Sequence, residues 1–120
     1  MMFQCPGTIY IYMIYGMYYC LNIVTEEAER GCAVLIRSII PKYNIAIMKK
    51  NRNDINNTKD ISNGPAKLFQ ALSLNHDLNG FEINKSKLKI YDLGITVDNF
   101  RKTSRIGISK GIELPWRFVY

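Results

Sequence analysis

Cysteine and histidine are the residues in this chain best suited to metal or redox chemistry. The three cysteines, Cys5, Cys20 and Cys32, form no CxxC pair and have no histidine at a metal-ligand spacing, so we expect no zinc site. Their odd number also argues against a disulfide framework and favours reduced thiols in a cytosolic protein. His76 stands alone in a polar stretch, and we assign it no role.

Basic side chains point to a different kind of chemistry, the binding of a polyanion. Lys and Arg outnumber Asp and Glu by 16 to 10, which gives a formal net charge of +6. The excess is clearest in residues 101–117, where one acid, Glu113, faces five bases: Arg101, Lys102, Arg105, Lys110 and Arg117. This pattern favours nucleic acid as a partner. The alternative is a solvated cationic face on an ordinary enzyme, because small domains tolerate this charge.

Length and composition predict one domain, residues 1–120. A chain of 120 residues with 48% hydrophobic residues can build a core. The longest apolar stretch, residues 9–21, is interrupted by Gly16 and is shorter than the ~18–20 residues that a membrane-spanning helix needs. The N-terminus also lacks the basic region of a signal peptide. We therefore expect a cytoplasmic protein without a membrane partner.

The elements that would position functional residues begin with a tyrosine-rich hairpin. Residues 8–14 alternate, with Ile9, Ile11 and Met13 on one face and Tyr10, Tyr12 and Ile14 on the other, as in a β-strand. Gly16 permits a tight reversal, and residues 18–25 again have strand composition. This pattern predicts a hairpin with Tyr15 at its tip.

The remaining segments predict an α+β domain with a mostly antiparallel, curved sheet, either a roll or a partly open barrel, and a few short helices. Residues 32–40 are expected to form a third strand that Pro41 ends. Helices are expected at residues 45–52 and 65–72, the second with proline at its first position. Further short strands are predicted at residues 81–83, 87–91, 95–97, 105–109 and 116–120.

Four segments in one order resemble the alkyladenine, or 3-methyladenine, DNA glycosylases. They are PGTIYIYMIYGMYYCLNIV (residues 6–24), AVLIRSIIP (33–41), NGPAKLFQAL (63–72) and SRIGISKGIELPWRFVY (104–120). The resemblance runs from about residue 3 to the end of the chain and covers the C-terminal portion of the family. It implies a DNA repair enzyme that flips alkylated or deaminated purines out of double-stranded DNA and hydrolyses the N-glycosidic bond, without a metal or other cofactor. If the protein is bacterial, it would be associated with the nucleoid.

The resemblance also implies roles for residues of the hairpin. A flipped nucleotide leaves a hole in the base stack that a side chain can fill. Tyr15 matches the wedge residue, and its neighbours Met17 and Tyr18 would widen the plug. Tyr12 and Asn22 match the stacking tyrosine and the asparagine that discriminates damaged from normal purines. Without the resemblance, tyrosines in alternating strands are usually ordinary sheet residues.

Other basic residues are assigned less directly. Arg37 matches an arginine of the family's active-site region and would face the base pocket or the DNA backbone, unless it is an edge residue that reaches water. Lys67, near the start of the second helix, would contact a phosphate; the alternative is a solvated lysine. Arg105 and Lys110 of the basic C-terminal segment are the other expected DNA-backbone contacts.

One part of the family pattern is not matched. In the family, a glutamate in an ETEAY-like motif ahead of the hairpin acts as general base, whereas no Glu, Asp or His precedes Thr8 here. Glu26, Glu27 and Glu29 follow the hairpin and match nothing catalytic. Residues 1–7 resemble an internal family segment, so the chain is expected to begin inside an ancestral reading frame and to lack the family's N-terminal part. Exposed sheet edges and marginal stability would follow.

Three hypotheses follow for this chain. It is a glycosylase whose general base comes from a longer product or a separately encoded N-terminal segment, a non-catalytic module that binds damaged DNA, or a non-functional gene fragment. Excision of a base separates the first hypothesis from the second. Salt-sensitive binding to damaged duplex, lost in Tyr15→Ala, separates the second from the third.

Overall fold

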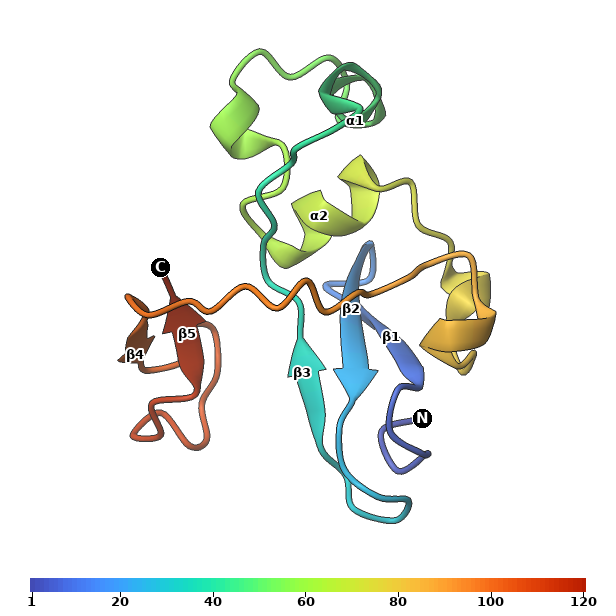
Figure 1. Cartoon of the computed structure of the whole chain (residues 1–120), viewed down its shortest axis with the longest axis vertical. Helices are drawn as coiled ribbons and strands as arrows, with labels where there is room; N and C mark the ends of the chain where they lie inside the picture. Colours follow the sequence, from blue (N-terminus) through green and yellow to red (C-terminus); the bar gives the residue numbers. More distant parts are fainter. The chain divides into compact units, whose positions relative to one another are not determined.

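The tyrosine-rich hairpin supplies two strands of a three-stranded antiparallel sheet in the computed structural model, which describes residues 1–120 (Figure 1). Strand β1 (Ile9–Ile14) pairs with β2 (Tyr18–Val24), with Ile9 opposite Ile23 and Ile14 opposite Tyr18. Strand β3 (Ala33–Leu35) pairs with the other edge of β2, so the strand order is β1-β2-β3. The prediction of an α+β fold with antiparallel pairing is confirmed, and the sheets do not close into a barrel.

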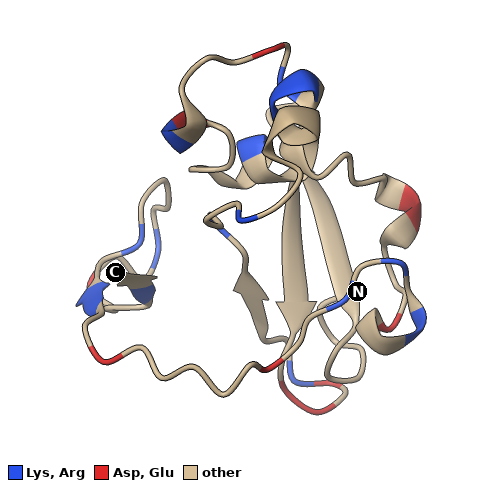
Figure 2. Ribbon diagram, turned by 45° about the horizontal axis from the view of Figure 1, so that its top comes forward, with Lys and Arg blue, Asp and Glu red and all other residues tan.

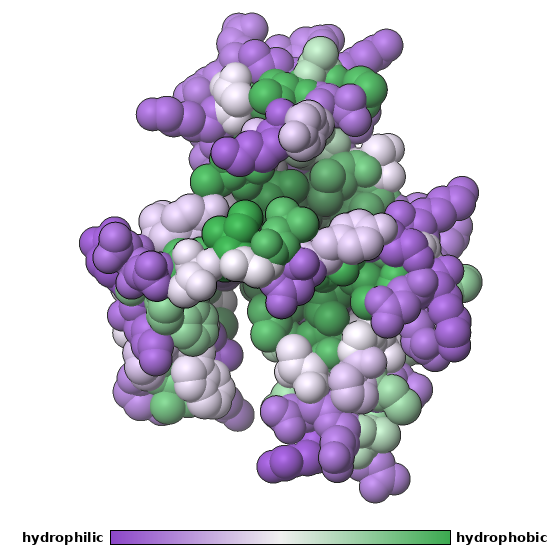
Figure 3. Space-filling model, in the orientation of Figure 1, coloured by the Kyte–Doolittle hydropathy of each residue, from purple (hydrophilic) through white to green (hydrophobic).

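One face of this sheet packs against a helix. Ile9, Ile11 and Leu21 are buried together with Leu68 and Phe69 of α2 (Pro65–Ala71). Pro65 stands at the start of α2, where its missing N–H costs no hydrogen bond. Leu68 and Phe69 thus form the buried face of this short helix, and Figure 3 shows apolar surface gathered around α2 and the strands.

A smaller helical lobe extends the core. Helix α1 (Ile45–Asn51) contributes Met48 to a cluster with Ile61 and Ala71. The Asn51 amide donates to the Ala71 carbonyl at 2.9 Å, which ties α1 to α2. Short 3-10 turns complete this part of the chain: η1 (Thr58–Asp60), η2 (His76–Leu78) and η3 (Ile83–Lys85). No helix is long and apolar enough to cross a membrane.

The chain divides into two compact units, Met1–Ile90 and Tyr91–Tyr120. The second unit is built on a short antiparallel pair, β4 (Arg101–Thr103) and β5 (Arg117–Val119). Strand β5 lies within the strand predicted at residues 116–120. The single domain expected from chain length stays a prediction.

Several predicted strands are wrong. Residues 81–83 make only an isolated bridge, Glu82 with Thr8, before the chain turns into η3. Residues 87–91 and 95–97 have no strand partner. The Ser86 hydroxyl donates to the Leu88 carbonyl and accepts from the Leu88 N–H, and the Asp92 carboxylate accepts from the Gly94 N–H, so nearby side chains bind some of the backbone groups there. Residues 105–109 form a loop, and β4 lies just before them.

The third strand is shorter than residues 32–40. The Ile36 N–H still donates to the Leu21 carbonyl at 3.0 Å, one residue beyond β3. Farther on, the Ile39 N–H donates to the Ser62 carbonyl at 3.3 Å, and the Ser62 hydroxyl donates to the Ile39 carbonyl at 2.9 Å. The chain therefore leaves the sheet because its backbone groups find partners in the helical lobe.

Candidate functional site

The turn of the β1–β2 hairpin exposes aromatic and sulfur-containing side chains. Tyr15 and Gly16 have φ angles of 52° and 69°, and the Met17 N–H donates to the Ile14 carbonyl at 3.2 Å. Two successive positive φ angles match the twist of the strands in a tight hairpin. The Tyr15 side chain is 85% exposed, and Met17 and Tyr18 are exposed beside it. The three residues predicted to enter DNA are thus together at one solvent-facing turn.

The second face of the sheet, opposite α2, carries the tyrosines predicted to line a base pocket. Tyr10 and Tyr12 have ring centroids 5.5 Å apart with planes inclined at 38°. Their partners on β2 are Asn22 and Cys20, respectively. Directly opposed residues of an antiparallel pair project to the same side, so Tyr12 and Asn22 share this face.

Asn22 is held firmly within the sheet. Its side chain is 5% exposed, and its Nδ2 donates to the backbone carbonyls of Tyr10 at 3.1 Å and Cys20 at 3.4 Å. Both hydrogen bonds use the amide nitrogen. The remaining polar atom, Oδ1, is the part of this side chain that is free to accept a hydrogen bond from a bound molecule.

Arg37 continues the row of side chains that Tyr12 begins. Asn22 lies opposite Leu35 in the β2–β3 register, and the bond from Ile36 to Leu21 extends this pairing. One further step of the register places Arg37 beside Cys20. Arg37 is half-buried and belongs to the tyrosine face rather than to the core face.

The pKa shifts of Tyr12 and Cys20 are consistent with their lying close to each other and to Arg37. Burial, followed by interactions with Cys20, raises the pKa of Tyr12 above its ordinary value, and the nearby Arg37 guanidinium opposes the shift. Burial also raises the pKa of the Cys20 thiol, with Tyr12 and Arg37 acting in the opposite direction. Both groups are therefore neutral near pH 7. The face offers aromatic rings, one amide oxygen and one cation to a flat ligand.

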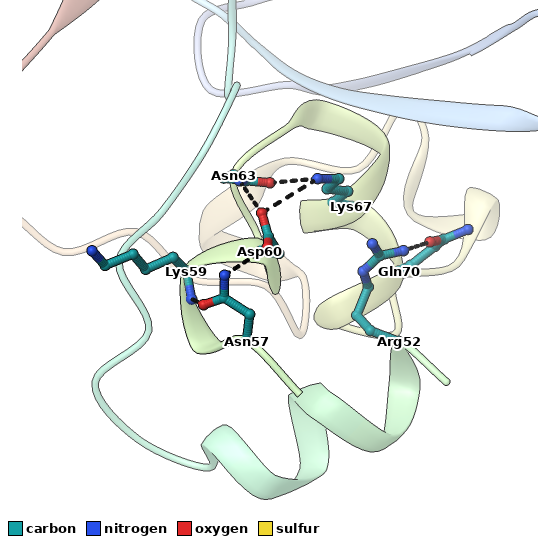
Figure 4. Close-up of polar contacts among 7 residues, drawn as sticks. All are labelled: Arg52, Asn57, Lys59, Asp60, Asn63, Lys67 and Gln70. Carbon is teal, nitrogen blue, oxygen red and sulfur yellow. Dashed lines mark hydrogen bonds and ion pairs between the residues drawn. The ribbon is translucent and has the colours of Figure 1, made fainter. Parts of the chain in front are cut away.

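Lys67 is tethered close to its own helix. Its ammonium donates to Asn63 Oδ1 at 2.8 Å and lies 3.9 Å from Asp60 (Figure 4). Asp60 in turn accepts from Asn57 and Asn63, each at 2.8 Å. A phosphate that bound Lys67 would compete with this partly exposed carboxylate.

Arg105 and Lys110 belong to the second unit. The Arg105 guanidinium lies 5.2 Å from the Trp116 ring centre and donates to the Lys110 and Gly111 carbonyls at 3.3 and 3.5 Å. Lys110 itself is exposed and has no ion-pair partner. Arg105 therefore organises the loop, while the Lys110 ammonium is free to meet an anion.

The acidic loop that follows the hairpin is remote from its tip. Glu26, Glu27 and Glu29 lie beyond the far end of β2, which runs for roughly 20 Å from Tyr18. Figure 2 shows acidic residues in the loop at the end of the three-stranded sheet away from the helices. Glu26 pairs with Arg30 at 3.6 Å. Their placement agrees with the absence of any catalytic match for them in the sequence.

Sequence reasoning missed Cys20 as a neighbour of Tyr12. The signal was present, because a hairpin turning at residues 15–17 opposes Tyr12 to Cys20. Sequence reasoning considered the cysteines only as metal ligands or disulfide partners. It therefore overlooked that Cys20 packs beside Tyr12.

Comparison with known proteins identifies relatives over the whole chain. The matching protein family is described as Methylpurine-DNA glycosylase and covers residues 1–120. A protein of Ehrlichia chaffeensis is 45% identical over 119 residues, one of Carboxydothermus hydrogenoformans is 40% identical over 119, and one of Rhodopseudomonas palustris is 38% identical over 117. Each bears the name "Putative 3-methyladenine DNA glycosylase".

These matches are unequal in coverage. Each alignment takes in 98% of this chain but only 60%, 62% and 58% of the respective relative. The chain thus spans about three fifths of the length of the relatives that it matches.

Proposed function

Because this chain belongs to the methylpurine-DNA glycosylase family, we propose that it acts in DNA repair on alkylated or deaminated purines in double-stranded DNA. In this proposal the chain supplies the wedge and much of the base pocket of a base-excision enzyme. The damaged nucleotide leaves the duplex, and its N-glycosidic bond is hydrolysed. No cofactor is required for this reaction.

The observation that carries the proposal is the exposed Tyr15 at the tip of a rigid two-stranded hairpin. A base inside a duplex is inaccessible, so its nucleotide must rotate out of the stack. A flat side chain entering the vacated space compensates for the lost stacking. Tyr15 is 85% exposed and held by a tight turn, while Met17 and Tyr18 would broaden the inserted surface.

The neighbouring sheet face is the proposed receptor for the flipped base. Tyr12 would stack on the base, and a cationic methylated purine would gain ~0.5–2 kcal/mol from the ring electrons. Asn22 Oδ1 would accept a hydrogen bond at the edge of the base. A purine that presented only an acceptor to Oδ1 would be disfavoured, because a buried acceptor would remain unpaired.

The DNA backbone would be bound by the basic side chains. Lys110 is an exposed cation without an ion-pair partner, and Lys67 and Arg105 are proposed as additional phosphate contacts. Arg37 is proposed to line the base pocket, since it continues the row that contains Tyr12.

The hydrolytic step needs a carboxylate to activate water. We propose that this group comes from the family's glutamate-containing segment, in the same polypeptide or in a partner chain. A second candidate function, recognition of damaged DNA without excision, is favoured by the location of Glu26, Glu27 and Glu29 roughly 20 Å along β2 from the hairpin tip.

A paired binding and excision assay tests the proposal. The 120-residue chain is incubated with duplexes that are identical except for one hypoxanthine, and binding and base release are measured under single-turnover conditions. Tighter binding to the damaged duplex supports the proposal, and base release would place the general base within these residues. Equal binding to the two duplexes, without release, would reject it.

A further inference from the structure

We propose that Cys20 is a positioning residue, which holds the Tyr12 ring in the orientation needed to stack on a flipped base. The inference rests on the proposed function, because it concerns the same base pocket. It starts from the row Tyr12–Cys20–Arg37, which runs from β1 across β2 to the segment that follows β3, on the face away from α2.

The register fixes the members of this row. Tyr12 and Cys20 are direct partners in β1 and β2. The β2–β3 pairing of Asn22 with Leu35 and the 3.0 Å bond from Ile36 to Leu21 bring Arg37 to the other side of Cys20. Cys20 therefore lies between Tyr12 of β1 and Arg37 of the segment that follows β3.

Burial separates Cys20 from the other two cysteines. Its side chain is 1% exposed, whereas Cys5 and Cys32 are exposed. Tyr12 is half-buried beside it, and a sulfur atom next to an aromatic ring is a favourable contact. Cys20 also helps to raise the pKa of Tyr12, and Tyr12 opposes the rise in the pKa of Cys20, so the two polar groups influence each other.

Tyr12 is thus restrained from two sides. The Tyr10 ring, 5.5 Å away, limits its movement along β1, and Cys20 limits its movement across the sheet. A stacking ring that is fixed before the base arrives loses less conformational freedom on binding than a mobile one.

The test compares three substitutions at one position in the full 120-residue chain. Cys20→Ala removes both volume and polarity, Cys20→Val restores volume alone, and Cys20→Ser restores polarity. Cys32→Ala is the matched control at an exposed cysteine. The first readout is the NMR signal of the Tyr12 ring in the free protein, assigned with Tyr12→Phe. The second is the ratio of affinities for duplexes with and without one hypoxanthine.

The expected result is a displaced or exchange-broadened Tyr12 signal in Cys20→Ala and Cys20→Val, and a signal near that of the wild type in Cys20→Ser. The preference for hypoxanthine should fall about fivefold in Cys20→Ala, because a freed Tyr12 ring must be ordered when the base binds, and should return in Cys20→Ser. Affinity for undamaged duplex should not change.

Two results would overturn the inference: an unchanged Tyr12 signal in Cys20→Ala, or a serine variant that behaves like the valine variant, which would reduce the role of Cys20 to filling space. A wild-type chain without any preference for hypoxanthine would instead count against the proposed function. In that case the NMR readout alone decides whether Cys20 positions Tyr12.

Discussion

The side-chain amide of Asn22 donates a 3.1 Å hydrogen bond to the backbone carbonyl of Tyr10, its partner across the β1–β2 pair. The same nitrogen lies 3.4 Å from the Cys20 carbonyl. One side chain therefore fixes the local sheet geometry through its nitrogen and leaves its oxygen without a protein partner. The stability of the sheet and the proposed recognition of the base depend on the same residue.

This coupling predicts an order of stabilities at position 22. Asn22→Ala should lower the free energy of unfolding by ~1–2 kcal/mol, because two carbonyls lose a buried donor. Asn22→Asp should cost more at pH 7, because a carboxylate would face carbonyl oxygens without a proton to donate. Urea unfolding at pH 7 measures both effects. An aspartate variant as stable as the wild type would show that this hydrogen-bond geometry is wrong.

Tyr15 allows its proposed wedge role to be separated from folding. Its φ of 52° is unfavourable for a tyrosine but normal for glycine. Relief of that strain and the greater freedom of glycine in the unfolded chain nearly cancel, so Tyr15→Gly should change the free energy of unfolding by less than ~0.5 kcal/mol. Binding to hypoxanthine-containing duplex should nevertheless weaken at least about tenfold, through loss of stacking.

The matched control for this variant is Tyr43→Ala. Tyr43 is equally exposed, at 85%, but lies just before α1 rather than on the hairpin tip. The Tyr43→Ala variant should bind damaged duplex with the affinity of the wild type in a fluorescence anisotropy titration. Equal losses in the two variants would reject a specific role for Tyr15.

The hairpin was predictable from sequence because its information is local. Alternation of Ile and Tyr, followed by Gly16, determines both the strands and the turn, and the structure has them at Ile9–Ile14 and Tyr18–Val24. The helix at Pro65 was predictable for the same reason, since the proline that marks its first position lies within the segment itself.

The segment from residue 81 to residue 97 was not predictable in this way. Its β-branched and aromatic residues favour strands, but a strand also needs a partner with free backbone groups. Glu82 makes a single bridge to Thr8, and the Ser86 and Asp92 side chains accept hydrogen bonds from the Leu88 and Gly94 N–H groups instead. The row Tyr12–Cys20–Arg37 was missed because it depends on two registers at once, of which only the hairpin register could be inferred from the turn.

Lys110 provides a test of the electrostatic contribution. An exposed lysine that neutralises one phosphate contributes about 0.9 to the slope of log affinity against log salt, so Lys110→Ala should reduce that slope by about this amount. Lys85→Ala is the control, because Lys85 is paired with Glu82 at 3.0 Å. Binding to undamaged duplex at several salt concentrations measures the slope, and identical slopes for wild type and Lys110→Ala would remove Lys110 from the interface.

The role of Arg105 should depend on the planar shape of its guanidinium as well as on its charge. Arg105→Lys keeps the charge but loses the planar contact with Trp116 and the fork that reaches the carbonyls of residues 110 and 111. Trp116 is the single tryptophan of the chain, so its fluorescence reports on this contact. We expect emission to shift to longer wavelength while the salt dependence of DNA binding stays unchanged. An unshifted spectrum would show that the guanidinium does not cover the indole ring.

Tyr12 and Cys20 together predict how stability changes at alkaline pH. Their pKa values in the folded chain are raised, mainly by burial, above ordinary values of 10.0 and 9.0. The folded state therefore holds these protons more tightly than the unfolded state. This contribution to stability is complete below the ordinary thiol pKa and is lost as the pH rises through the folded pKa values.

Urea unfolding between pH 7 and pH 11 measures this loss. Each group can contribute a slope of at most about 1.4 kcal/mol per pH unit between its unfolded and folded pKa values. The double variant Tyr12→Phe with Cys20→Ala removes both groups, so its stability should decline less steeply above pH 9 than that of the wild type. The control, Tyr43→Phe with Cys32→Ala, removes an exposed tyrosine and an exposed cysteine and should follow the wild-type curve. Parallel curves for all three proteins would show that Tyr12 and Cys20 titrate alike in the folded and unfolded chains.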